Sequence, residues 1–161
     1  MGMDVYGLNP QLKSERPKID FSDATEQERT EYFDALDLFE RDNPGYYFRN
    51  NVWWWRPLWD YVCDVCESVM SDTDAERGEY NEGYEYDAEL TAKMVALLDA
   101  DIAQNGHHLY EKKHLAEQEK ARKKEESGEI EKAWVCSYPF DPVNVEEFVD
   151  FLKNSGGFKI C

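Results

Sequence analysis

One segment near the middle of the chain reads Gly45-Tyr-Tyr-Phe-Arg-Asn-Asn-Val-Trp-Trp-Trp-Arg-Pro-Leu-Trp-Asp-Tyr61, and it holds four of the five tryptophans. Each buried Trp or Tyr side chain removes roughly 150–250 Å² from water, so several together can form the core of a small domain. Pro57 suits the first turn of a helix, and the apolar residues after it recur at helical spacing. We therefore expect residues 46–55 to be extended or irregular and residues 56–70 to form a helix.

The same segment has a second interpretation, as the lining of a small ligand pocket. Arginine guanidinium groups and aromatic rings can stack on a base or a sugar, and a carboxylate could complete such a site. The residues expected to line it are Arg49, Asn51, Trp53, Trp55, Arg56 and Asp60. Core packing, with the arginines paired to carboxylates such as Asp60, is the favoured interpretation, and the pocket is the alternative.

The length and composition indicate one domain over residues 1–161. Aromatic residues make up 14% of the chain, which is too many for a disordered protein. No apolar run is long enough to cross a membrane, and no basic segment precedes an apolar one as in a signal peptide. We therefore expect a soluble protein of the cytoplasm that does not contact a membrane.

The formal net charge of −17 is concentrated in two stretches. Residues 20–42 contain nine acids and two bases, and residues 60–101 contain thirteen acids and two bases. Such a surface repels phosphate, which argues against direct binding of nucleic acid. It would instead attract a basic protein surface, although acidity can also serve solubility alone.

The first acidic stretch has the pattern of a helix over residues 25–41. Tyr32, Phe33, Leu36 and Phe39 are expected on one face of it. The carboxylates on the broad opposite face are Glu28, Glu31, Asp34, Asp37 and Glu40. This acidic face is our first candidate for contact with a basic partner, and a face that is simply solvated is the alternative.

The remaining pattern predicts an α+β fold that is mainly helical, with four to five helices around an aromatic core. Further helices are expected at residues 87–105, 107–126 and 144–155. The segment 107–132 is highly charged and is expected to be exposed. Short strands near residues 3, 135 and 159 are expected to form a small sheet that joins the two ends of the chain.

Four cysteines raise the question of a zinc site. Cys63, Cys66, Cys136 and Cys161 offer four thiolates, but only the first two form a close pair, whereas a strong zinc signal has two pairs. Buried free thiols are therefore the favoured interpretation. His107 and His114 share a helical spacing, but no zinc-protease motif is present. We expect no metal and no other cofactor.

Three segments of the chain carry a resemblance to known sequences. They are the start Met1-Gly-Met-Asp-Val-Tyr-Gly7, the run Tyr47-Phe-Arg-Asn-Asn-Val-Trp-Trp-Trp-Arg-Pro-Leu58, and the tail Ser137-Tyr-Pro-Phe140 with Gly156-Gly-Phe-Lys-Ile-Cys161. Together they resemble an uncharacterised family of small hypothetical proteins from bacteriophages and bacteria. The resemblance implies a location in the cytoplasm of a bacterial host cell and supplies no catalytic residue.

The motifs of common enzymes are missing from the sequence. It has no Gly-rich phosphate loop, no Gly-x-Ser-x-Gly motif and no deaminase motif, and we predict no catalytic residue. The expected function is that of an acidic, non-enzymatic interaction protein. In the phage context this is an anti-defence inhibitor, such as an anti-CRISPR protein, that mimics nucleic acid and blocks a basic nucleic-acid-binding surface of a host protein. The alternative is a small-ligand (nucleotide or sugar) binding protein, or an enzyme, with its pocket at the Trp/Arg cluster.

Overall fold

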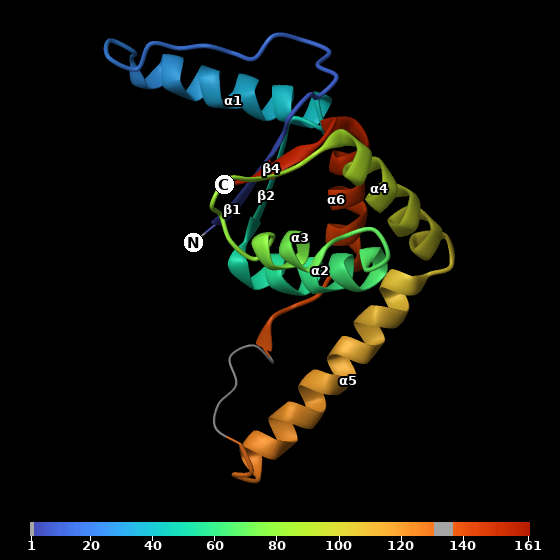
Figure 1. Ribbon diagram of the computed structural model, residues 1–161. Helices are drawn as coiled ribbons and strands as arrows, with labels where there is room; N and C mark the ends of the chain where they lie inside the picture. The colour runs from blue at the N-terminus through green and yellow to red at the C-terminus, as the bar shows by residue number, and fades with distance from the viewer. Residues whose placement is uncertain (1, 131–136) are drawn as a thin grey trace.

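The computed structural model describes residues 2–130 and 137–161 of the chain (Figure 1). In these residues six helices and four strands follow one another in the order β1 (Gly2–Gly7), α1 (Glu26–Asp42), β2 (Tyr47–Asn51), α2 (Val52–Cys66), α3 (Asp72–Arg77), β3 (Tyr84–Tyr86), α4 (Ala88–Ala103), α5 (Gly106–Glu126), α6 (Pro142–Ser155) and β4 (Phe158–Ile160). The predicted fold class, mainly helical α+β with a small sheet, is confirmed.

The four strands form one antiparallel sheet in the order β2-β1-β4-β3. The N-terminal strand β1 pairs with the C-terminal strand β4, and the backbone amide of Cys161 donates to the carbonyl oxygen of Asp4 over 2.7 Å. The predicted joining of the two chain ends is therefore confirmed. Met3 and Val5 of β1 and Ile160 of β4 point into the core, because alternate residues of a strand face opposite sides.

Helix α2 begins earlier than its sequence pattern indicates. The Asn51 side chain accepts hydrogen bonds from the backbone amides of Trp53 and Trp54, and so caps the helix at Val52. The expectation that residues 52–55 are extended is therefore wrong, and Pro57 lies inside the helix instead of in its first turn. The consequence is that the consecutive tryptophans point in different directions around the helix axis, and only some of them reach the core.

Two tryptophans of α2 form the centre of the core. The rings of Trp55 and Trp59 stack with centroids 5.4 Å apart, and both side chains are fully buried. Their indole N–H groups donate to the carbonyl oxygens of Gly78 and Ala75, each over 2.8 Å. Gly78 must be glycine, because a Cβ atom at this position would overlap the indole of Trp59. The segment after α2 therefore covers the tryptophans closely and satisfies their polar atoms.

The other core helices are α4, which packs against α2 and α6, and α6, which also packs against β1 and β2 of the sheet. Asp141 caps α6 at its start, and Gly156 ends it with a positive φ of 63°. Phe148 of α6 contacts the Trp55 ring edge-on at 5.6 Å and the Phe48 ring at 5.1 Å. These contacts join the C-terminal helix to the tryptophan-rich segment.

Helix α1 stands apart from this core. Figure 1 shows it, together with the loop that precedes it, projecting from one end of the sheet. Its first turn is closed by a capping box between Thr25 and Glu28. Its last turn is attached to the body through Phe39, which is buried and contacts the ring of Tyr46 at 5.0 Å. The rest of the helix is thus presented to solvent.

Three elements were not predicted, and one prediction cannot be compared with the structure. The segment 71–86 contains α3 and the strand β3, and Tyr47–Asn51 forms the strand β2. Of the strand expected near residue 135, residues 134–136 lie outside the described residues. Ser137 and Tyr138 are described and are not in a strand. The missed strands are short and gain their stability from pairing with β1 and β4, which are distant in the sequence.

Candidate functional site

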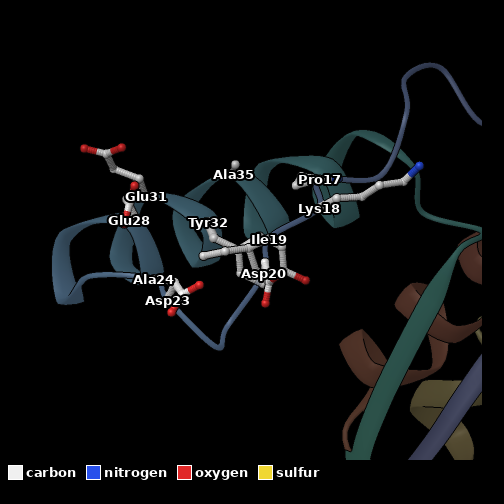
Figure 2. A pocket seen from close by; sticks show the side chains of 10 residues that line it. All are labelled: Pro17, Lys18, Ile19, Asp20, Asp23, Ala24, Glu28, Glu31, Tyr32 and Ala35. Carbon is white, nitrogen blue, oxygen red and sulfur yellow. The ribbon is translucent and has the colours of Figure 1, made fainter.

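The first candidate site is the segment of residues 17–42, which we call the acidic arm. It consists of the loop 17–25 and α1, and it carries nine acids and three bases. The loop folds back along the helix and leaves an open groove of about 590 Å³. Asp20, Asp23, Glu28 and Glu31 are among the residues that line this groove, and Figure 2 shows the Glu31 carboxylate and the Lys18 amine directed away from each other at its two ends.

Basic side chains near the acidic arm neutralise few of its carboxylates within the described residues. Among the described residues, the arm makes one ion pair, between Arg41 and Asp42 at 3.8 Å. The guanidinium group of Arg29 donates instead to the backbone carbonyl oxygen of Phe21 over 3.1 Å. Asp34 and Asp37 are exposed and have no ion pair with the described residues. The negative charge of the arm is therefore largely uncompensated.

The five predicted partner-binding residues do not share one environment. Glu28, Glu31, Asp34 and Asp37 are exposed, whereas Glu40 is half-buried where α1 meets the body. Burial, followed by the negative charge of Asp37, raises the pKa of Glu40. Steps of three residues rotate by about 60° around a helix, so these carboxylates wind around α1 instead of forming a straight row. Four of them are exposed, and Glu40 is the exception.

Exposed apolar side chains accompany the charges of the acidic arm. Phe21, Phe33 and Leu38 each keep 45–52% of their surface exposed. Phe21 contacts Tyr32 edge-on at 5.4 Å, and Tyr32 contacts Phe33 at the same distance. These aromatic contacts hold the loop against the helix outside the main core. The arm consequently combines free carboxylates with apolar contact area.

The second candidate site is a smaller pocket of about 260 Å³ beside α2. Trp55, Arg56 and Asp60 line it, as the sequence suggested for a Trp/Arg pocket. Residues from three other segments complete the lining, and these are Glu79, Tyr80, His114 and Tyr138. The sequence around the tryptophans could not predict these four residues. They reach the pocket only because α5 and the segments after α3 and α5 pack against α2.

Side chains of both charge signs line this pocket. Loss of water around its carboxyl group, followed by the nearby carboxylates of Glu79 and Asp64, raises the pKa of Asp60. The guanidinium group of Arg56 lies 5.9 Å from the centre of the Tyr138 ring, within range of a cation–π interaction. Nε2 of His114 is 2.7 Å from the carbonyl oxygen of Tyr138, which can only accept, so this nitrogen is the donor. The pocket thus offers an anion, a cation and aromatic walls.

Three of the predicted pocket residues lie elsewhere. Arg49 is on the outward face of β2, with its Nε 3.6 Å from a carboxylate oxygen of Asp4. Asn51 caps α2, and Trp53 is 46% exposed, with its ring edge-on to Tyr138 at 4.8 Å. Trp53 is three residues before Arg56 and therefore shares its face of α2. It does not line the pocket itself, but its ring contacts the Tyr138 ring that does.

The cysteines do not assemble a zinc site in the described residues. Cys63, Cys66 and Cys161 are free thiols, and no group of three metal-ligating side chains in this part of the chain includes a cysteine. Burial raises the pKa of both the Cys63 and the Cys66 thiol to about 12. A thiolate is the form that binds metal, so these two residues are poor ligands near neutral pH. Cys136 lies outside the described residues.

Comparisons with known proteins add no family to these observations. No protein-family model, no curated protein and no solved structure matches the chain. Within residues 2–130 and 137–161, the helices all lack the combination of length and apolar character that crossing a membrane requires. The functional argument therefore rests on the two sites themselves.

Proposed function

We propose that the chain is a non-enzymatic interaction protein whose acidic arm occupies a basic, nucleic-acid-binding surface of a bacterial protein. The observation that carries the proposal is the position of the arm, which projects from the core with carboxylates that its own bases do not neutralise (Figure 1). A helix held in this way is accessible to a partner from most directions. Helix α1 contacts the body of the protein mainly through Phe39, which lies near the C-terminal end of the helix.

The spacing of the charges supports mimicry of a nucleic acid. Carboxylates three residues apart are about 4.5 Å apart along the axis of an α-helix, and the four exposed ones, from Glu28 to Asp37, extend over about 14 Å. One strand of B-DNA carries a phosphate about every 3.4 Å along its axis. The acidic arm therefore presents a charge density of the same order as one strand. Lysine and arginine side chains that neutralise phosphates would meet carboxylates at similar intervals.

The apolar side chains of the arm favour binding to a protein over the mere attraction of small cations to its carboxylates. Phe21, Phe33 and Leu38 add contact area that a nucleic acid would not offer in the same form. Aromatic side chains are enriched among the residues that contribute most to binding energy in protein interfaces. The resemblance of three segments to bacteriophage and bacterial proteins supports a partner in a bacterial cell, where an anti-defence inhibitor would act on a nuclease complex or a similar nucleic-acid-handling protein.

A competition experiment tests this function. The chain is immobilised and exposed to nuclease-treated bacterial lysate at low and at high salt, and the recovered protein is purified. We expect a basic protein that is retained at low salt only, because screening weakens exposed charge pairs. In a polarisation assay the free chain should then displace labelled nucleic acid from this protein. A recovered protein that binds the chain and the nucleic acid at the same time would contradict the proposal.

The pocket beside α2 supports a second candidate function, the binding of a small nucleotide or sugar. The observation that favours it is the concentration of Arg56, Asp60 and His114 around a volume of about 260 Å³. Ligand pockets for drug-sized molecules begin at roughly 300 Å³, so this pocket suits a ligand at or below the small end of that range. Tyr80 and Tyr138 are aromatic walls on which such a ring could stack.

The Arg56→Ala substitution tests the pocket. Binding of a panel of nucleoside monophosphates and monosaccharides is followed by tryptophan fluorescence and by NMR chemical shifts. For any compound that binds, we expect Arg56→Ala to weaken binding by at least about tenfold, since a hydrogen bond to a charged group contributes roughly 1.5–3 kcal/mol. Arg49→Ala is the matched control, because Arg49 lies outside the pocket beside Asp4. Equal losses in both variants, or no binding by the panel, would count against a ligand site here.

A further inference from the structure

His107 is a buried histidine whose surroundings do not explain it as a packing residue. It stands in the first turn of α5, and its side chain is only 3% exposed. Its Nε2 atom faces a carboxylate oxygen of Glu146 on α6, while its Nδ1 atom has no hydrogen-bond partner in the described residues. Buried polar atoms in proteins nearly always have a partner. Nδ1 is an exception among the described residues, and Nε2 is the nitrogen that faces a second polar side chain.

The distance between His107 and Glu146 fits two arrangements. Nε2 of His107 lies 3.2 Å from Oε1 of Glu146, which is the length of an ordinary hydrogen bond. Two donor atoms bound about 2.0–2.1 Å from a tetrahedral Zn²⁺ ion are also about 3.3 Å apart. The separation is therefore that of one edge of a zinc coordination shell. The two residues are 39 positions apart in the sequence and lie on different helices, so the fold holds them at this distance.

His108 places a third donor beside this pair. A ring nitrogen of His108, a ring nitrogen of His107 and a carboxylate oxygen of Glu146 all lie within 4.8 Å of one another. The imidazole rings of His107 and His108 have centroids 4.3 Å apart. The side chains of His108 and Glu146 are 52% and 54% exposed, so their rotamers can adjust to a shared ion. In the described residues this is the one group of three such donors that close together.

The nature of the donors selects the class of cation. Two imidazole nitrogens and one carboxylate oxygen suit Zn²⁺ and its neighbours Ni²⁺ and Co²⁺, whereas Mg²⁺ and Ca²⁺ prefer sites made of oxygen. Three protein ligands leave one position of a tetrahedral ion open to water. The carboxylate of Glu111 lies 3.9 Å from Nδ1 of His108 and adds negative charge next to the site.

We propose that His107, His108 and Glu146 form a surface binding site for Zn²⁺ that connects the start of α5 to α6. His107 is the fixed ligand, because the core holds its ring in place, and His108 and Glu146 close over the ion from the surface. A bound ion would tie α5 to α6 at the point where α5 leaves the core. The site is separate in sequence and in lining from both the acidic arm and the pocket beside α2.

Calorimetric titration of the intact protein with Zn²⁺ tests the proposal. We expect one saturable site, and we expect His108→Ala and Glu146→Gln each to weaken Zn²⁺ binding by at least about tenfold. Loss of a residue that merely orients a ligand already costs about 10–100-fold in metal affinity. Both residues are about half exposed, so the variants should fold, and circular dichroism checks this. The matched control is Glu147→Gln on the same helix, which should bind Zn²⁺ like the parent chain.

Absorption spectra of the Co²⁺-loaded protein separate this site from binding by cysteine. A site of imidazole and carboxylate gives weak visible bands, whereas thiolate ligands add intense near-ultraviolet charge transfer. Weak visible bands that disappear in Glu146→Gln would support the assignment. Strong thiolate bands, unchanged Zn²⁺ affinity in both variants, or the absence of saturable binding would overturn it. In each of those cases His107 is a histidine hydrogen-bonded to Glu146 without a metal role.

Discussion

Replacing Trp59 with alanine is expected to lower the free energy of unfolding by about 3–5 kcal/mol. The indole is 1% exposed, stacks on Trp55 and contacts the ring of Tyr86 at 5.6 Å. Its removal leaves a large cavity and also leaves the carbonyl oxygen of Ala75 without its donor. Domains are stable by about 5–15 kcal/mol in total, so this loss is a large fraction of the whole.

Trp53→Ala is the matched control for Trp59→Ala. It changes the same residue type in the same helix, but Trp53 is 46% exposed and contacts mainly the edge of Tyr138. We expect it to cost about 1 kcal/mol, the contribution of one aromatic pair. Urea denaturation followed by far-ultraviolet circular dichroism measures both variants without relying on tryptophan fluorescence. Similar losses in the two variants would show that the Trp55–Trp59 stack is not the centre of stability.

Reversing three charges of the acidic arm is expected to weaken binding to the basic partner by at least about 100-fold. The variant is Glu31→Lys, Asp34→Lys and Asp37→Lys in one chain. Like charges brought together across an interface cost several kcal/mol, and each 1.4 kcal/mol is a factor of ten in affinity. Asp34 and Asp37 have no ion pair among the described residues, and Glu31 only accepts a hydrogen bond from Gln27, so the fold should remain intact.

A second triple variant controls for net charge in that experiment. Glu67, Glu147 and Asp150 are exposed acids outside the acidic arm. Their replacement by lysine changes the net charge from −17 to −11, the same change as in the arm variant. The affinity of both variants for the purified partner is measured by titration at several salt concentrations. If the control variant loses as much affinity as the arm variant, the interaction follows total charge, and the arm is not the binding surface.

Local sequence patterns were sufficient for most helices and for the joined ends of the chain. The apolar spacing of α4 and α6, with Asp87 and Gly156 at their ends, predicted elements that the structure contains. Predictions from these features succeed because a helix cap or an apolar stripe depends only on residues that are close in the sequence. The patterns failed at α2, where the cap provided by Asn51 outweighed the preference of Pro57 for a first helical turn.

The candidate sites were predicted only in part. The acidic character of α1 follows from its residues, and so does the presence of Arg56 and Asp60 on one helical turn. The contributions of Glu79 and His114 to the pocket depend on how separate segments pack. The same holds for Glu146 beside His107, since nothing in a local pattern relates two residues on different helices.

The sequence by itself determined the composition of the core, the location of the negative charge and the class of fold. Those properties are sums over residues or depend on neighbours within one or two helical turns. The tertiary structure alone decided that α1 projects from the core, and that Trp55 and Trp59 are buried while Trp53 is exposed. It also decided which polar side chains meet. Long-range packing determines these features, because the free energy of burying an aromatic ring exceeds the local preferences of the chain.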